Sequence, residues 1–502
     1  MTITPLVMAG TGPFFNPLIQ STAVASPNHV NELNSPWQVP AGVIGRNLLS
    51  LREVEADVAQ SIQRVDAGNI SSMFDMMAYE PTGRYIFIPH ETPFGAGVSR
   101  HDTLTDTTEL LFAGDQMAGG KRECDPSSCD RWAHDFAAFD PARWTPNGTV
   151  WLGEEWAGLG RVVEIMNPLS PAPEDPTASA LIEGSDYRIV ETVANVAHEG
   201  IHFSRAHPNR VIYYIDEWNS GSIYALRLKQ AGDYMAGGQT FVLSVDDFAA
   251  SGGDASAMWN DEVNEGATRF GPATWIPLTD EDGKPLEGVT DPFRDGPTID
   301  PRDDAGLVRG GRAAADDVGG TPYGRPEDME VGSLKNGSEV LYVTTTAEHA
   351  VLSIEMLGDN RAYVRSFASR ATPKNLGLPP TTGGLNAPDN LAQDASGNIY
   401  IVEDAPNRSD VGGDVWFARD MDNDGVAESI DHFMSMQVAG SESTGMIFHP
   451  TEPTKFVIAV QHPTSTDLGM VPDGFGDAVW EFDIAGAVPP PAPDQASQSS
   501  TD

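Results

Sequence analysis

The stretch HEGIHFSRAHPNRVIYYIDEW, residues 198–218, holds two short runs of β-branched and aromatic residues on either side of a His-Pro-Asn-Arg segment. This pattern predicts a β-hairpin, because Ile, Val and Tyr favour extended strands while Pro and Asn favour tight turns. In such a hairpin the start of the first strand and the end of the second lie at the same end. We therefore expect Glu199 beside Asp216 and Glu217.

Similar runs recur along the chain, each led in by turn residues. They are GRYIFIPHE (83–91), GTVWLGEEW (148–156), NRVIYYIDEW (209–218), SEVLYVTTT (338–346), GNIYIVEDA (397–405) and TKFVIAVQHP (454–463). Most neighbouring runs start about 60 residues apart, and the third and fourth start about twice as far apart. A repeat of that length accommodates four short strands and long loops. The sequence predicts an all-β fold, a six-bladed β-propeller.

The long interval predicts an insertion between the third and fourth hairpins, at about residues 228–320, where the sequence is acidic and rich in glycine. The alternative for this interval is a seventh, degenerate blade. We expect an N-terminal extension over residues 1–45, the propeller over 46–485, and a disordered tail rich in Pro and Ser over 486–502.

The overall charge narrows the choice of partners. The chain has 73 Asp and Glu against 30 Lys and Arg, a formal net charge of -43. Such a surface repels nucleic acids and anionic membranes, and no apolar run is long enough to span a bilayer.

Cys124 and Cys129 could close a local disulfide but are too few for a zinc site. No signal peptide is visible, yet we expect a secreted or periplasmic monomer.

The same hairpin geometry in the other repeats gathers acidic residues at one mouth of the channel. It places Glu327 near Thr346, and Asp389 near Glu403 and Asp404. Carboxylates crowded in a partly desolvated funnel either have raised pKa values or bind cations. Oxygen donors with little sulfur or imidazole favour hard ions, calcium first.

A second calcium signal is local, in DMDNDGVAESID (420–431). Positions 1, 3, 5, 9 and 12 of a calcium loop are matched by Asp420, Asp422, Asp424, Glu428 and Asp431, with a glycine at position 6. The flanking segments resemble strands, so we expect a structural calcium site within a hairpin. The alternative is a solvated turn rich in aspartate.

HEGIH (198–202) matches the HExxH pattern of zinc proteases, which requires both histidines on one face of a helix. The surrounding residues predict strands. The extended form of the motif also fails, at Arg205 and Pro208. The sequence therefore argues against a metalloprotease.

Several blocks together resemble the PhoX-type alkaline phosphatases, over about residues 75–463. The blocks include PHETPFGAGVSR, WTPNGTVWLGEEW, GRPEDME, APDNLAQDASGNIYIVED, ESTGMIFHP and AVQHP. The resemblance implies a six-bladed propeller with a mixed iron–calcium cluster at the channel mouth. It also implies hydrolysis of phosphate monoesters, with some relatives acting on diesters.

The resemblance further implies the roles of individual residues. It assigns metal ligands at Glu91, Glu155, Glu199, Asp216 and Glu327, and a phosphate-binding role to Arg325. Arg325 could alternatively form an ion pair with a neighbouring acid. Asp140 stands where the family has a cysteine that bridges the irons. A carboxylate is a harder ligand than a thiolate, so this departure favours calcium or magnesium over iron.

The prediction is a metal-dependent phosphoric-ester hydrolase that acts on a small phosphate ester and uses calcium. Its expected metal ligands also include Asp389 and Asp404. Two other functions remain open at this stage. One is a calcium-dependent lactonase-like propeller, and the other is a non-catalytic calcium-binding surface or interaction module.

Overall fold

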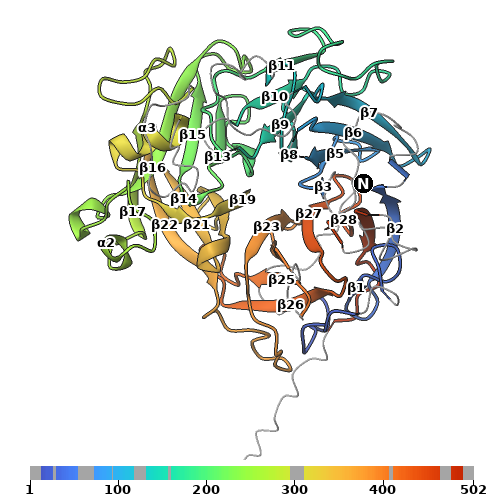
Figure 1. Cartoon of the computed structure of the whole chain (residues 1–502). Coiled ribbons are helices and arrows are strands. Elements are labelled where there is room, and N and C mark those ends of the chain that lie inside the picture. Colours follow the sequence, from blue (N-terminus) through green and yellow to red (C-terminus); the bar gives the residue numbers. More distant parts are fainter. Residues whose placement is uncertain are drawn as a thin grey trace, which may run out of the picture.

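The computed structural model describes residues 13–25, 30–51, 53–54, 73–92, 94–117, 132–156, 160–293, 310–405, 411–463 and 476–489. Cys124 and Cys129, and with them the expected disulfide, lie outside the described residues. Short antiparallel sheets follow one another around a common centre, in chain order (Figure 1). The predicted all-β class and a propeller-like arrangement of sheets are therefore confirmed.

The first two sheets come from residues 73–189. The first contains β3 (Met73–Phe74), β4 (Ala78–Tyr79), β5 (Tyr85–Glu91), β6 (Gly97–Asp102) and β7 (Thr107–Ala113). The second contains β8 (Phe139–Trp144), β9 (Val150–Glu154), β10 (Val162–Ile165) and β11 (Tyr187–Ile189). In each sheet the earliest strands lie nearest the centre (Figure 1).

The middle of the chain forms one nine-stranded sheet. One group of four consists of β12 (Ile201–Phe203), β13 (Val211–Ile215), β15 (Ile223–Leu228) and β16 (Gly238–Val245). A second group consists of β19 (Pro326–Ser333), β20 (Glu339–Thr345), β21 (Ala350–Gly358) and β22 (Arg361–Ser369). Strand β17 (Gly271–Pro277) pairs with both β16 and β22 and so joins the groups.

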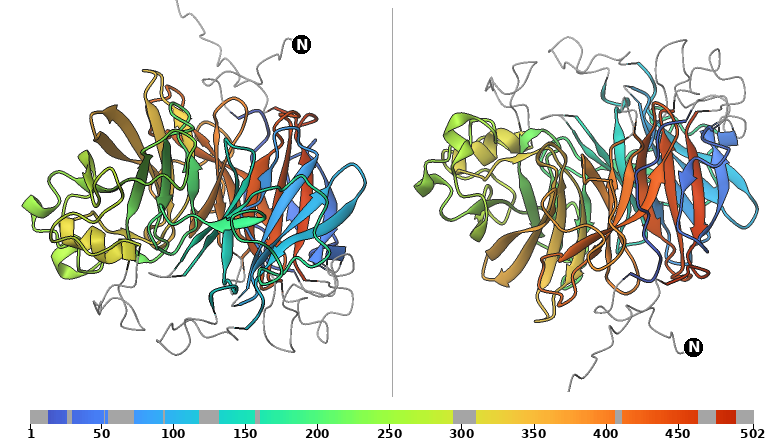
Figure 2. Two further views of the ribbon diagram at one scale, coloured as in Figure 1. Left: turned by 90° about the horizontal axis from the view of Figure 1, so that it is seen from above. Right: turned by 90° about the horizontal axis from the view of Figure 1, so that it is seen from below.

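The segment expected as an insertion thus contributes β16 and β17 to this sheet. Its other elements are the short helices η2 (Ala249–Ser251), α2 (Glu262–Glu265) and α3 (Gly310–Val318). Helices α2 and α3 lie outside the ring, beside the nine-stranded sheet (Figures 1 and 2). Strands β14 (Asn219–Gly221) and β18 (Tyr323–Gly324) form a separate two-stranded pair, which joins the chain before this segment to the chain after it. The short helix η3 (Thr346–Glu348) follows β20.

The last two sheets bring the two ends of the chain together. One contains β23 (Pro388–Gln393), β24 (Ile399–Glu403), β25 (Asp414–Arg419) and β26 (Ser429–Met436), with β1 (Trp37–Gln38) at its edge. The other contains β27 (Glu442–Phe448), β28 (Lys455–Gln461), β29 (Ala478–Asp483) and β2 (Ile44–Ser50). Because β2 pairs with β29, the N-terminal part of the chain completes the final sheet.

Each of the six recurrent runs contains one strand next to an inner strand, as β5, β9, β13, β20, β24 and β28. The hairpin expected over residues 198–218 is β12–β13, with Ile201 opposite Tyr214. His202 lies in β12 and His198 precedes it in non-helical backbone. The helical geometry of a zinc protease is therefore absent from this segment.

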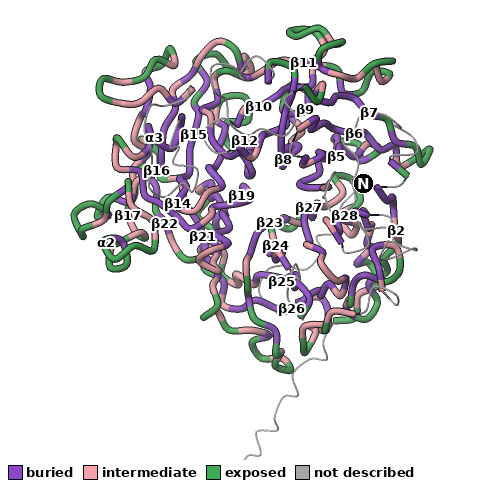
Figure 3. The backbone as a smooth tube through the Cα atoms, viewed as in Figure 1, coloured by how far each residue is buried: buried purple, intermediate pink, exposed green. Residues whose placement is uncertain are grey.

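Apolar side chains fill the spaces between successive sheets. One cluster contains Val98 of the first sheet and Leu152 of the second, and another contains Tyr400 of the fifth sheet region and Phe456 of the last. A further cluster joins Ile86 of the first sheet to Val457 of the last, so the packing continues around the ring. Each fully buried side chain of this size contributes roughly 1.5–3 kcal/mol. The strands are buried and the outer loops exposed (Figure 3).

Within the described residues, none of the helices has the length and apolar character needed to cross a membrane.

Candidate metal centre

The inner strands share an irregularity in their pairing close to the centre. The register shifts fall between Phe139 and Ala142 in β8, between Pro326 and Met329 in β19, between Pro388 and Leu391 in β23, and between Thr444 and Ile447 in β27. A β-bulge takes a residue out of the ladder and redirects its side chain. In three of these bulges the displaced residues include an acid: Asp140, Glu327 and Asp389.

Backbone hydrogen bonds fix the partner strand at the same end. The N–H groups of Glu155, Glu217 and Asp404 donate to the carbonyls of Ala138, Ala197 and Ala387, at 2.7, 2.8 and 2.9 Å. Each acceptor lies two residues before the inner-strand acid of its own hairpin. The hairpin geometry therefore brings an acid from each strand to one end, which is why acidic residues of distant sequence meet.

We call the resulting set the acidic ring. Its members are Asp75, Glu91, Asp140, Glu155, Glu199, Glu217, Glu327, Asp389, Asp404 and Glu442. The tightest group is Glu199, Glu217 and Glu327, all buried, with carboxylate oxygens within 4.8 Å of one another. Burial raises the pKa of Glu199 and of Glu327, and the neighbouring carboxylates raise each of them further.

Arg325 is the cation of this group. Its Nε donates a hydrogen bond to Oε1 of Glu217 at 2.6 Å and lies 3.0 Å from Oε1 of Glu327. The two carboxylates raise the pKa of Arg325 above its ordinary value, so the guanidinium stays charged. The side chain is nevertheless 42% exposed. Arg325 thus lies at the boundary between the buried acids and solvent.

A second group forms on the other side of the ring. Asp75 accepts hydrogen bonds from Thr444 Oγ1 at 2.6 Å and from Gln461 Nε2 at 2.7 Å. Burial raises the pKa of Asp140 well above its usual range, and the charges of Asp75, Glu155 and Glu91 raise it further. The pKa of Glu155 is also raised, by burial and then by Glu217. Glu217 belongs to the first group of the ring, so the first and second groups interact electrostatically.

A third group completes the ring. Burial, followed by the charge of Asp404, raises the pKa of Asp389 to about 7. The pKa of Glu442 is raised by burial and then by Asp404 and Asp389. Oε2 of Glu442 also lies 3.2 Å from Nε2 of His462.

The donor set fits a hard cation. Oδ1 of Asp140 and Oε2 of Glu199 are buried and accept no hydrogen bond from any described residue. A buried carboxylate oxygen without a donor is costly unless a positive charge compensates it. The ring supplies carboxylate oxygens, which are the ligands that calcium prefers. One or more divalent cations would satisfy these oxygens.

Asp216 is placed differently from the expectation. Arg312 donates to both of its oxygens, at 2.6 and 2.7 Å, and the N–H of Ala197 donates to Oδ1 at 3.1 Å. The Arg312 and Asp216 side chains are 3% and 0% exposed. The structure therefore brings Glu217, not Asp216, to the acidic ring. Consecutive residues at a strand end point in different directions, and only Glu217 points to the centre.

The Asp-rich loop after β25 partly matches a calcium loop. Carboxylate oxygens of Asp420, Asp422 and Asp424 lie within 4.8 Å of one another. However, Lys335 Nζ lies 2.9 Å from Asp422 Oδ2. Glu428 accepts the N–H of Met421 at the loop, at 2.7 Å. Asp431 lies in β26, where it pairs with Arg419 at 2.9 Å, so the structure does not bring it to this group.

Three ring members were not assigned from the sequence: Asp75, Glu217 and Glu442. The hairpin argument could have found two of them. FDMMAYEPTGRYIF places Asp75 before a turn and a recurrent run, and SESTGMIFHP places Glu442 at the start of its inner strand. Glu217 was expected near Glu199, and the sequence alone does not rank it above Asp216.

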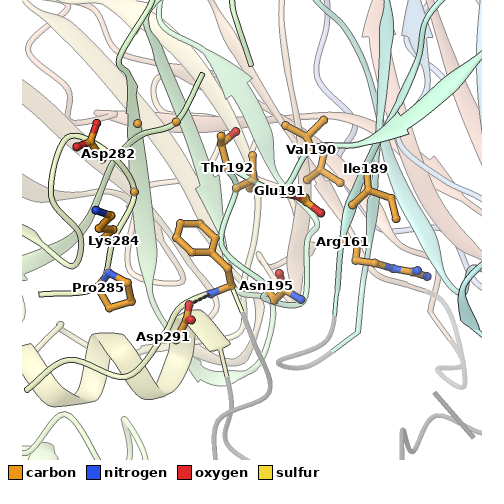
Figure 4. A pocket seen from close by; sticks show the side chains of 16 residues that line it. Arg161, Ile189, Val190, Glu191, Thr192, Asn195, Asp282, Lys284, Pro285 and Asp291 are labelled. Atoms are coloured by element: carbon orange, nitrogen blue, oxygen red, sulfur yellow. Dashed lines mark hydrogen bonds between the residues drawn. The ribbon is translucent and has the colours of Figure 1, made fainter. Parts of the chain in front are cut away.

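A pocket of about 500 Å³ lies apart from the ring (Figure 4). It is lined by Val162 and residues 189–193 on one side and by residues 282–285 on the other, with Arg161 at its edge. Arg161 donates to Glu154 at 2.6 Å and to the carbonyls of Trp132 and Asp135. No member of the acidic ring lines this pocket, which lies between the second sheet and the segment that follows β16.

The fold and the ring define a class: a propeller-like β protein with a buried, all-carboxylate site suited to cations. The family model of alkaline phosphatase PhoX matches residues 190–464. The chain belongs to the PhoX alkaline phosphatase family. None of the curated proteins matches the sequence.

One solved structure supports the fold. The structure of Pseudomonas fluorescens PhoX in complex with vanadate, a transition state analogue, is 15% identical with a TM-score of 0.58. The match covers 95% of this chain and 99% of that one. A gluconolactonase from Xanthomonas campestris is 10% identical, with coverages of 96% and 98%, and its TM-score of 0.38 carries no further argument.

Proposed function

We propose that this protein hydrolyses phosphate esters at the acidic ring, with calcium as its main cation. The observation that carries the proposal is the position of Arg325, a charged and partly exposed guanidinium at the edge of a buried carboxylate site. Membership of the PhoX family supports phosphatase activity. The vanadate held by the Pseudomonas fluorescens protein is an analogue of the kind of transition state that we propose here.

Arg325 would bind and orient the phosphoryl group. Its contacts with Glu217 and Glu327 both involve Nε. With respect to these two described residues, the terminal nitrogens are left for an anion. A planar guanidinium binds two phosphoryl oxygens at once and offsets the charge that develops on them. The two carboxylates hold this side chain in place, as preorganised electrostatic stabilisation requires.

The carboxylates of the ring would hold the cations. Glu199, Glu217 and Glu327 form one candidate site, and Asp140 with Glu91 and Glu155 forms another. Bound divalent cations supply the positive charge that lets an anionic ester and an attacking water meet at such an acidic surface. Burial of the ring limits the access of bulk water and strengthens these charge interactions.

Calcium is proposed over iron because Asp140 is a hard oxygen donor. It stands where the family has a cysteine, and its Oδ1 is one of the buried carboxylate oxygens of the ring that accept no hydrogen bond from a described residue. We also propose a second, structural calcium at Asp420, Asp422 and Asp424. That ion would stabilise a loop and take no part in the reaction.

We propose six blades for the propeller, with the two groups of the nine-stranded sheet as the third and fourth, joined by β17. The six apolar clusters between successive sheets or groups support this count. A secreted or periplasmic monomer remains our proposal for location and state.

The proposal is tested with p-nitrophenyl phosphate and bis-p-nitrophenyl phosphate, on protein treated with a chelator and then resupplied with calcium, magnesium or iron. We expect calcium to restore hydrolysis of at least one ester, with the Arg325→Ala variant as the inactive control. Calcium binding without hydrolysis of either ester would refute the enzyme and favour a calcium-binding module. Hydrolysis of a lactone such as γ-butyrolactone in their place would favour the lactonase-like alternative.

A further inference from the structure

The segment between β15 and β18, described over residues 229–293 and 310–322, makes several contacts with the chain beside the acidic ring, two of which lie next to Glu217 and Arg325. The first is the ion pair between Arg312 of α3 and Asp216, with contacts at 2.6 and 2.7 Å. Arg312 also lies over the ring of Trp218, at 5.2 Å from its centroid. Asp216 and Trp218 are the two chain neighbours of Glu217. The conformation on both sides of Glu217 is thus held by one arginine from a distant segment.

The turn around Glu217 has little freedom of its own. The N–H of Trp218 donates to the carbonyl of Asp216, and that of Gly221 donates to the carbonyl of Trp218. A Cβ atom at Gly221 would lie 1.8 Å from the carbonyl oxygen of Asp216, so the two strands of backbone are in close contact. A shift of Asp216 would therefore be passed directly to Glu217.

The second contact lies beside Arg325. The indole Nε1 of Trp259 donates to Asn219 Oδ1 at 2.9 Å, and the backbone N–H of Trp259 donates to Ser220 Oγ at 2.6 Å. The same indole packs against Gly324, where an added Cβ would lie 2.6 Å from the ring. Trp259 thus bridges the strand that follows Glu217 and the residue that precedes Arg325.

Arg325 needs such support because its backbone is in the left-handed region, with φ of 49°. A non-glycine residue holds that conformation only where the surroundings fix it. Glu348 accepts the N–H of Gly324 at 2.7 Å, and Arg269 of the same distant segment donates to Glu348 at 2.7 Å. The guanidinium of Arg269 lies 5.3 Å from the centroid of Trp259.

We propose that Arg312 and Trp259 are positioning residues, through which the described parts of the segment between β15 and β18 set the geometry of Glu217 and Arg325. The inference rests on the proposed function, in which Glu217 binds a cation and Arg325 binds phosphate. A buried ion pair is weak evidence for stability, because desolvation offsets much of its attraction. Its two-pronged geometry is better suited to fixing one orientation of the adjoining chain.

Arg312→Lys and Trp259→Leu test the proposal, with Arg188→Lys as the matched control. Arg188 pairs with the buried Glu164 at 2.6 Å, in the second sheet, away from the ring. Hydrogen exchange is measured on calcium-free protein for peptides that cover residues 213–221 and 323–330. We expect faster exchange in both variants at these peptides and no change there in the control.

Calcium affinity is the second measurement, by calorimetric titration of the same proteins. We expect Arg312→Lys to weaken calcium binding by about tenfold or more, the scale seen when a residue that orients a metal ligand is changed. Trp259→Leu should weaken the inhibition by vanadate, because it acts on Arg325. Arg188→Lys should change neither property.

Unchanged exchange in both folded variants would overturn the inference, and so would unchanged calcium and vanadate affinities. An equal loss in Arg188→Lys would also overturn it, because the effect would then be general destabilisation. The proposed function fails separately, if the unmodified protein binds calcium but hydrolyses no phosphate ester. If the unmodified protein bound no calcium, the exchange measurement alone would decide the inference.

Discussion

Replacing Glu327 by glutamine should change the stability of this protein in opposite directions with and without calcium. Glu327 is 1% exposed, and its carboxylate is crowded against Glu199 and Glu217. Without a cation, the substitution relieves the crowding of three buried carboxyl groups, while Arg325 keeps its 2.6 Å contact with Glu217. With calcium, the same substitution removes a ligand oxygen of full negative charge.

The magnitudes follow from linkage. A cation present at a hundred times its Kd stabilises the folded state by about 2.7 kcal/mol, and a variant with a hundredfold weaker Kd loses about 2 kcal/mol of that. For a chain of this length the entropy of unfolding makes this loss about 2 °C in Tm. Without calcium, an ionised carboxylate in the crowded group destabilises the folded state. The loss is about 1.4 kcal/mol for each unit by which crowding raises the pKa of that carboxyl group.

The assay is thermal unfolding at pH 8 of both proteins, in chelator and in excess calcium, together with a calcium titration. We expect Glu327→Gln to equal or exceed the unmodified protein in chelator and to fall below it in calcium. Glu164→Gln, in a buried ion pair away from the ring, is the control and should be destabilising under both conditions. A loss of the same size for Glu327→Gln with and without calcium would refute the reasoning.

Five further predictions concern the acidic ring, Arg325 and the Asp-rich loop. Calcium affinity should rise between pH 6 and 8 with release of protons, seen by calorimetry in buffers of different ionisation enthalpy, because Asp389, with a pKa of about 7, must deprotonate. In chelator, stability should fall as pH rises from about 4 to 7, since the folded state then binds protons that the unfolded state has lost; a flat profile would contradict the raised pKa values. Elemental analysis should find calcium and little iron, and Asp140→Cys should increase the iron content; equal metal content in both proteins would contradict this role for Asp140. Arg325→Ala should lower ester turnover by about 10²-fold or more with folding intact, and full activity in the variant would leave Arg325 a structural role. Asp424→Asn should reduce the stabilisation by calcium without changing turnover per active site, and a loss of turnover would contradict a purely structural loop.

Local sequence was sufficient for the hairpins and for the end at which their acids gather. The runs of Ile, Val and Tyr around 211–215 and 399–403 favour strands, and the turn residues before each run fix its antiparallel pairing with the preceding strand. Pairing within a hairpin depends only on residues close in the chain, so the meeting of Glu199 with the end of β13 followed from the sequence.

The choice between adjacent acids depended on the tertiary structure. Asp216 and Glu217 both follow strand β13, so their positions in the sequence do not distinguish them. Asp216 is taken up by an ion pair with Arg312, which lies 96 residues further along the chain. The bulges that redirect Asp140 and Glu327 are likewise absent from any local pattern, because they form where several inner strands converge. Sequence by itself determined the hairpins and the end of each at which acids gather. Only the packing of distant segments decided which carboxylates face the cation, because side-chain direction there is set by long-range contacts.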